Sequence, residues 1–110
     1  MKKARKNKWL RALRGKSPRG EYIQGSGRLV ETKCDQDHFC CLGVLINEIG
    51  EFDHENVPVV DGKRGICDKN LGGLLSKLRL SIREQGTLIE MNDNNRNSFE
   101  EIADWIEKNI

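Results

Sequence analysis

The sequence predicts an α+β fold in which four to five helices accompany one or two short antiparallel β-hairpins. Two serines open helical segments with the S-x-x-E pattern of a capping box. A continuous apolar stretch in the middle of the chain predicts a buried helix, and two glycine-containing turns lie between extended runs. With 110 residues, the chain is expected to form a single domain spanning residues 1–110.

The first predicted helix spans residues 3–14. Trp9 and Leu13 lie four residues apart in it and therefore share one face. The glycines and proline of residues 15–20 end this helix. Residues 1–8 are so basic that a flexible arm is a second interpretation of the N-terminus.

A first hairpin is predicted around Gly25-Ser26-Gly27. The flanking residues 22–24 and 28–32 are extended runs, and a three-residue loop with glycine suits such a connection. A glycine-rich loop can also present backbone N–H groups to a phosphate. This G-x-G is too short to specify that function by itself.

Residues 39–49 are apolar on nearly every face, which predicts a buried helix, with a buried strand as the alternative. Asp35 or Asp37 is expected to cap its start. Gly50 is expected in the left-handed conformation after its end. Gly43 permits close approach of a neighbouring element.

A second hairpin is predicted around the two-residue turn Asp61-Gly62, between runs 57–60 and 63–67. Pro58 predicts that its strand lies at a sheet edge, because proline donates no backbone hydrogen bond. Residues 51–56, which precede this hairpin, are expected to form an acidic loop.

The C-terminal third reads as three helices. Leucines at i, i+3, i+4 and i+7 within residues 71–78 form an apolar stripe, and capping boxes at Ser81 and Ser98 open the next two helices. Residues 92–97 are expected to form a polar loop between the last two. The predicted core comprises Leu13, Leu29, Leu42, Leu45, Ile46, Leu74, Leu78, Leu88, Ile89, Phe99, Ile102 and Ile106.

Charge is divided unevenly along the chain. Residues 1–33 carry eleven basic and two acidic residues, a net charge of +9, whereas residues 34–110 carry a net charge of −7. The basic segment either contacts the phosphates of a nucleic acid or lies against the acidic body of the protein itself. Its candidate residues for binding nucleic acid or another partner are Lys2, Lys3, Arg5, Lys6, Lys8, Arg11, Arg14 and Arg19.

The cysteines do not have the spacing of a metal site. Cys34, Cys40, Cys41 and Cys67 include no C-x2-C pair, so no metal and no cofactor are expected, and the cysteines are expected to be reduced. A nucleophilic pair of cysteine and His38 lacks an identifiable third residue. Both histidines lie in charged segments, and we therefore do not expect an enzyme.

Five motifs occur in order along the chain: W-x3-LR at 9–14, Y-x-QG-x-G-x-L at 22–29, CCLGVL at 40–45, L-x2-MND at 88–93 and SF-x2-IAD-x-IE at 98–107. Together they resemble a family of small bacteriophage and prophage proteins of uncharacterised function. The resemblance implies no activity. It implies that a shared site lies in the glycine-containing loop and the Asn-Asp loop, where the candidate ligand-binding residues are Gln24, Gly25, Gly27, Arg28, Asn92 and Asp93.

Small size, charge asymmetry and this resemblance favour a phage-encoded accessory protein. We expect it to bind a host macromolecule and to inhibit a host defence or regulatory system. Nucleic-acid binding through the basic segment and sequestration of a small nucleotide signal are the alternatives. The longest apolar run is far shorter than the ~20 residues that span a bilayer, and no secretory signal follows the basic N-terminus. We therefore expect a location in the host cytoplasm and no membrane partner.

Overall fold

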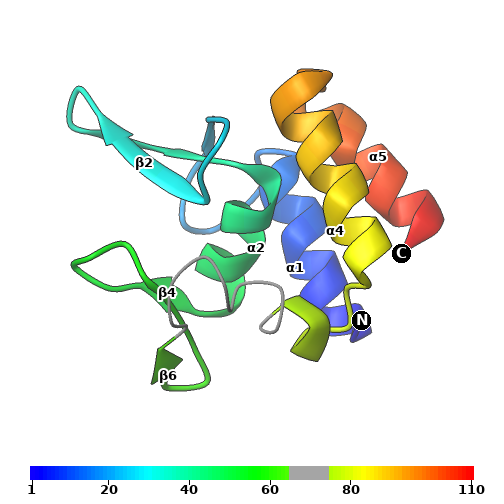
Figure 1. Cartoon of the computed structure of the whole chain (residues 1–110), viewed down its shortest axis with the longest axis horizontal. Coiled ribbons are helices and arrows are strands. Elements are labelled where there is room, and N and C mark those ends of the chain that lie inside the picture. The colour runs from blue at the N-terminus through cyan, green and yellow to red at the C-terminus, as the bar shows by residue number, and fades with distance from the viewer. Residues whose placement is uncertain (65–74) are drawn as a thin grey trace.

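The helices and the short strands occupy different parts of the structure (Figure 1). The computed structural model describes residues 1–64 and 75–110. The predicted α+β fold is confirmed. In chain order its elements are α1 (Lys3–Leu13), β1 (Ile23–Gln24), β2 (Val30–Lys33), β3 (Gln36–Phe39), α2 (Cys41–Ile49), β4 (Glu51–Phe52), β5 (Pro58–Val60), β6 (Lys63–Arg64), α4 (Ile82–Ile89), the π-helix η1 (Glu90–Asn94) and α5 (Phe99–Asn109).

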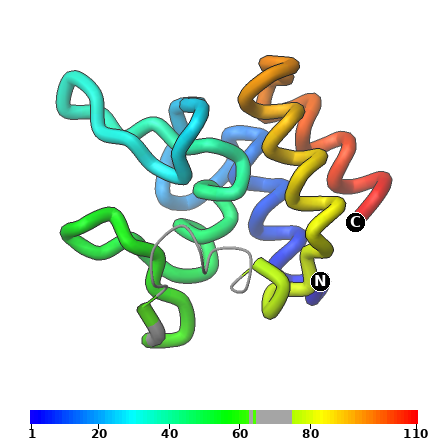
Figure 2. The backbone as a smooth tube through the Cα atoms, in the orientation of Figure 1, coloured from blue at the N-terminus to red at the C-terminus, as the bar shows by residue number. Residues whose placement is uncertain are grey.

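The buried helix α2 lies at the centre, between the strands and the other helices (Figure 2). Residues 41–46 of α2 are all buried, as their apolar composition predicts. α1 packs against α2 on one side and against α5 on another. The indole of Trp9 on α1 is fully buried, and its Nε1 donates a hydrogen bond to the carbonyl oxygen of Cys41 at 2.8 Å. This bond fixes the first helix against the start of α2.

The ends of α2 differ from the prediction. The helix begins at Cys41, and Cys40 caps it through a sulfur that accepts a hydrogen bond from the backbone N–H of Gly43. The predicted caps Asp35 and Asp37 lie instead in the preceding β-hairpin. Gly50 has a φ of −151°, so it does not adopt the predicted left-handed conformation.

Two glycines of this region are required by close packing. A Cβ on Gly43 would lie 1.9 Å from the carbonyl oxygen of Leu29, and a Cβ on Gly50 would lie 2.2 Å from that of Val59. Real Cβ atoms do not approach an oxygen so closely. The prediction that Gly43 permits a close approach is therefore confirmed, and the approaching element is the chain just before β2.

The first sheet has the strand order β1-β3-β2, which overturns the predicted hairpin between residues 22–24 and 28–32. β1 pairs with β3 in parallel, and β2 pairs with β3 antiparallel. The hairpin is β2–β3, and its two turn residues Cys34 and Asp35 both have positive φ, as a type I′ turn requires. The prediction missed β3 because only Phe39 of its four residues is buried, so no apolar alternation marks it.

The second sheet has the order β4-β5-β6. The predicted Asp61-Gly62 turn is confirmed, with both φ values positive. The prediction of an edge strand at Pro58 is wrong, because Glu51–Phe52 forms β4 and pairs with β5 on its other side. Pro58 is tolerated there because it is the first residue of its strand. Residues 65–67 of the predicted second strand lie outside the described residues.

The turn between β4 and β5 is organised by Asp53. Its carboxylate accepts hydrogen bonds from the backbone N–H groups of Glu55 and Val57 and pairs with Arg64 on β6. The bond from Val57, supported by Arg64, lowers the pKa of Asp53 to about 2. The predicted acidic loop at residues 51–56 is therefore a strand followed by a turn that one carboxylate holds.

The capping boxes at Ser81 and Ser98 are both present. Each serine hydroxyl accepts a hydrogen bond from the backbone N–H of a glutamate three residues later, and that glutamate accepts one from the backbone N–H of the serine. Leu75 and Leu78 are buried as predicted for the preceding stripe, whereas Leu71 and Leu74 lie outside the described ranges. In residues 1–64 and 75–110, no helix is long and apolar enough to cross a bilayer.

Two predictions about the C-terminal third are corrected. The chain expected to form a polar loop from residue 92 remains helical as η1 up to Asn94, and Asn92 is buried at 3% exposure. Ile89, predicted in the core, is 45% exposed because it lies on the outer face of α4.

Leu29, in the N-terminal third, was also predicted in the core. It is only partly buried, at the edge of the core.

Candidate functional site

Four of the six candidate ligand-binding residues meet around the buried side chain of Asn92. Its Nδ2 donates to the carbonyl oxygen of Gly25 and to the carboxylate of Asp93, both at 2.8 Å. Its Oδ1 accepts from Gln24 Nε2 and from the backbone N–H of Cys41, both at 3.1 Å. We call these residues, Gln24, Gly25, Asn92 and Asp93, the Asn92 cluster.

Every hydrogen-bonding atom of the Asn92 amide is used inside the fold. Gln24 Nε2 donates a further hydrogen bond to the carbonyl oxygen of Asn97, and Gly25 donates its backbone N–H to Phe39 on β3. The backbone N–H of Gly25 is therefore bonded within the sheet and is not available to a phosphate. The cluster joins the chain after β1, the start of α2 and the middle of η1, so its role is structural.

Gly27 and Arg28, the other two candidates of this set, lie outside the Asn92 cluster. Gly27 has a φ of +80° and open space around its Cα, and Arg28 is exposed. Asp93 accepts its hydrogen bond from the neighbouring Asn92 and forms no ion pair with a described residue. The charged members of the predicted site are thus not brought together.

The predicted basic residues divide into two groups. Four of them contact polar groups of the protein itself: Arg5 pairs with Asp61, Lys6 donates to the carbonyl oxygen of Glu107, Arg14 pairs with three acidic residues of α5, and Arg19 lies 4.0 Å from a carboxylate oxygen of Glu48. The other four are Lys2, Lys3, Lys8 and Arg11, which are exposed and form no ion pair within the described ranges.

Arg14 connects α1 to α5. Its guanidinium donates to Asp104 at 3.0 Å and to Glu107 at 2.8 Å, and its Nε lies 3.5 Å from Glu100. The carboxylates of Asp104 and Glu107 raise the pKa of Arg14, with the hydrogen bond to Asp104 as the largest cause. The expectation that the basic segment lies against the acidic body of the protein is therefore met on this side of α1.

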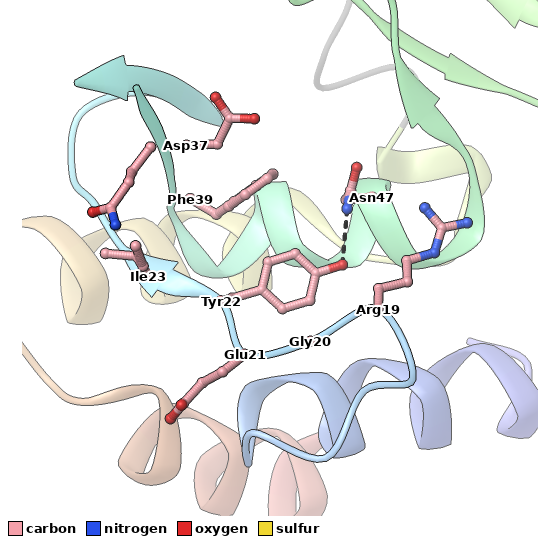
Figure 3. Close-up of a pocket in the computed structure, with 9 residues that line it drawn as sticks. Arg19, Gly20, Glu21, Tyr22, Ile23, Asp37, Phe39 and Asn47 are labelled. Carbon is pink, nitrogen blue, oxygen red and sulfur yellow. Dashed lines mark hydrogen bonds between the residues drawn. The ribbon is translucent and has the colours of Figure 1, made fainter. Parts of the chain in front are cut away.

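A surface hollow of about 250 Å³ lies beside the segment that leads into β1 (Figure 3). Tyr22 reaches across it toward α2, where its hydroxyl accepts a hydrogen bond from Asn47 Nδ2 at 2.9 Å and donates one to Glu48 at 2.6 Å. The ring of Tyr22 meets that of Phe39 edge to face, with centroids 4.9 Å apart. The hollow is smaller than the ~300–1,000 Å³ of most small-molecule sites.

The carboxylate of Glu48, which the hydroxyl of Tyr22 contacts behind this hollow, is a buried charge with a side chain that is 6% exposed. It accepts hydrogen bonds from the hydroxyls of Ser17 and Tyr22. Burial and the bond to Glu48 raise the pKa of Tyr22 to about 12. Sequence reasoning missed this group, although a charged residue inside the apolar run 39–49 was the signal that could have revealed it.

Two of the cysteines that the structure describes, Cys40 and Cys41, are buried. Burial raises the pKa of the Cys40 and Cys41 thiols and so disfavours the thiolate that a nucleophile or a metal ligand needs. Cys34 is exposed in the β2–β3 turn, and Cys67 lies outside the described residues. Within residues 1–64 and 75–110, no three or more His, Cys, Asp or Glu residues are grouped to hold a metal ion.

Comparison with known proteins gives a family and no function. No curated protein and no solved structure matches the chain. The family model described as "Domain of unknown function (DUF8296)" matches residues 1–71, the segment that runs from α1 past β6. α4, η1 and α5 lie beyond that segment, so Asn92 ties the matched part of the chain to the rest. The chain therefore belongs to the DUF8296 family, a family of domains of unknown function.

Proposed function

We propose that this chain is a small accessory protein of the bacteriophage or prophage kind that binds a host nucleic acid through the solvent face of α1. The observation that carries the proposal is the division of the basic residues. The fold pairs those beside α5 and the strands, and it leaves Lys2, Lys3, Lys8 and Arg11 exposed, without an ion pair to any described residue.

These exposed cations share one side of α1. At 100° per residue, Lys3, Arg11 and Lys8 fall within an arc of about 140°, opposite the face that buries Trp9 and Leu13. The rise of 1.5 Å per residue separates Lys3 from Arg11 by about 12 Å along the axis. One strand of a duplex presents a phosphate about every 3.4 Å along its axis, so this row spans three to four phosphates.

A row of exposed cations favours a polyanion. Each phosphate that a lysine or arginine neutralises releases counterions, which drives binding without regard to base sequence. The phage resemblance of the motifs at residues 9–14 and 98–107 supports a role inside a host cell. There, covering nucleic acid would obstruct a host defence or regulatory system, and we infer the host cytoplasm as the location.

The test compares two triple variants of equal charge by fluorescence anisotropy with a labelled duplex at several salt concentrations. Lys3→Gln/Lys8→Gln/Arg11→Gln removes the three positive charges on the exposed face of α1. Lys33→Gln/Lys77→Gln/Lys108→Gln removes three exposed cations from other elements. We expect the first variant to bind weakly and to lose about three units of the slope of log K against log salt, and the control to lose less than about one.

Three outcomes would overturn this proposal. The unaltered protein could fail to bind the duplex at low salt, or both triple variants could lose affinity equally, which would make net charge the only cause. Binding to polyglutamate in preference to nucleic acid would instead indicate an acidic protein partner. Circular dichroism of both variants checks that α1 remains folded.

A further inference from the structure

The outer face of α4 carries an apolar stripe that the fold leaves exposed. Ile82 is 81% exposed and Ile89 is 45% exposed, and their spacing of seven residues places them two turns apart on one face. Single exposed apolar side chains are ordinary. Two isoleucines aligned on one helix are a surface that another helix can cover.

Gly86 lies between these isoleucines on the same face. Glycine in a helix interior destabilises the helix relative to alanine, so its presence needs a reason. Gly86 does not have positive φ, and nothing lies within 4 Å of the place where a Cβ would stand. Neither the backbone conformation nor packing within the described structure requires glycine here. A missing side chain at the centre of an apolar stripe lets a second helix approach closely.

The charges on this face are self-complementary. Arg83 lies near the beginning of α4, and Glu90 lies at its end. Arg83 forms no ion pair with a residue that the structure describes. A two-fold axis through Gly86, perpendicular to the helix, brings the basic end of one α4 against the acidic end of another.

We propose that a second copy of this chain docks on this face, so that two α4 helices cross antiparallel at Gly86. In this arrangement Ile82 packs against Ile89 of the partner subunit, and Arg83 faces Glu90 of the partner subunit. One two-fold axis therefore brings the isoleucines into contact, lets the helices approach at Gly86 and pairs the opposite charges. A single helix pair is a small interface, so the dimer is weak and depends on concentration.

Sedimentation velocity on the full chain over a concentration series, without nucleic acid, tests this proposal independently of the proposed function. We expect the unaltered protein to shift from monomer to dimer as concentration rises. Gly86→Leu fills the crossing point in space that the monomer leaves open, and it should weaken dimerisation more than about tenfold. Ile23→Ser removes an exposed isoleucine from β1 instead and should leave the dimer unchanged.

A charge exchange tests the antiparallel geometry. Arg83→Glu places like charges together and should weaken dimerisation more than about tenfold, and Arg83→Glu/Glu90→Arg should restore it. A monomer at every concentration, a dimer insensitive to Gly86→Leu, or no recovery in the double variant would overturn the proposal. Circular dichroism separates these results from misfolding, and Gly86→Ala supplies a second, milder variant with a better helix former.

Discussion

The side-chain oxygen of Asn92 accepts the backbone N–H of Cys41 at 3.1 Å, a hydrogen bond between residues 51 positions apart. Cys41 is the first residue of α2, where backbone N–H groups have no partner within the helix. A side chain from η1 therefore satisfies the beginning of the central helix. The same amide holds the carbonyl oxygen of Gly25, so one buried residue links three segments that are remote in sequence.

Replacing Asn92 by alanine should lower the free energy of unfolding by about 2–4 kcal/mol. The buried N–H of Cys41 and the partly buried carbonyl of Gly25 would lose this partner, at about 1–3 kcal/mol each. Urea denaturation measures the change. Asn94→Ala is the control, because Asn94 is exposed and bonds only the exposed carboxylate of Glu90, so its cost should stay below about 0.5 kcal/mol. Equal losses in both variants would contradict a tying role for Asn92.

Gly43→Ala should destabilise the protein by about 1–3 kcal/mol or more, because its Cβ would overlap the carbonyl oxygen of Leu29. Gly86→Ala places the same methyl group in open space on α4 and should stabilise the monomer by up to about 1 kcal/mol. Thermal unfolding in dilute solution compares the two. Similar changes in the unfolding temperature of both variants would show that the carbonyl oxygen of Leu29 does not lie against Gly43.

Tyr22 should ionise at about pH 12, and its contribution to stability should disappear at high pH. Its pKa is raised by burial and by its hydrogen bond to Glu48. Because the folded pKa exceeds the unfolded value of about 10, this contribution is complete below pH 10 and is lost as pH rises from about 10 toward 12. Tyr22 is the chain's single tyrosine, so the ultraviolet absorbance of the phenolate reports it alone.

Glu48→Gln is the matched variant for this titration. It removes the charge but keeps the size, so the pKa of Tyr22 should fall and yet remain above 10, because burial persists. A midpoint near 10 in the folded, unaltered protein would show that Tyr22 is solvated and that the bond to Glu48 is absent.

Arg14→Met should cost about 1 kcal/mol at low salt and less in 1 M salt. Arg14 contacts three exposed carboxylates of α5, and such surface pairs contribute little individually and are screened when the Debye length falls to about 3 Å. Unfolding in urea at both salt concentrations measures the difference. Lys16→Met, an exposed cation with no ion pair among described residues, should change stability by less than about 0.5 kcal/mol.

The sequence by itself determined the features that depend on neighbouring residues. The capping boxes at Ser81 and Ser98 need only a hydroxyl and a glutamate three residues later. The Asp61-Gly62 turn needs two adjacent residues that tolerate positive φ. The burial of residues 41–46 of α2 follows from apolar side chains on nearly every face of the helix. In each case the physical cause lies within one turn of helix or one strand connection.

Only the tertiary structure decided which distant groups meet. Nothing near Ile23 indicates that β1 pairs with β3 rather than β2, because one extended segment can pair with any available edge. From the sequence, Asn92 is predicted to be a loop residue. Only the fold brings Cys41, Gln24 and Gly25 into hydrogen-bonding contact with it. The sequence predicted a basic segment, but the packing of α1 against α5 decided that Arg14 is neutralised within the fold while Lys8, about 120° away around the helix axis, stays exposed to solvent.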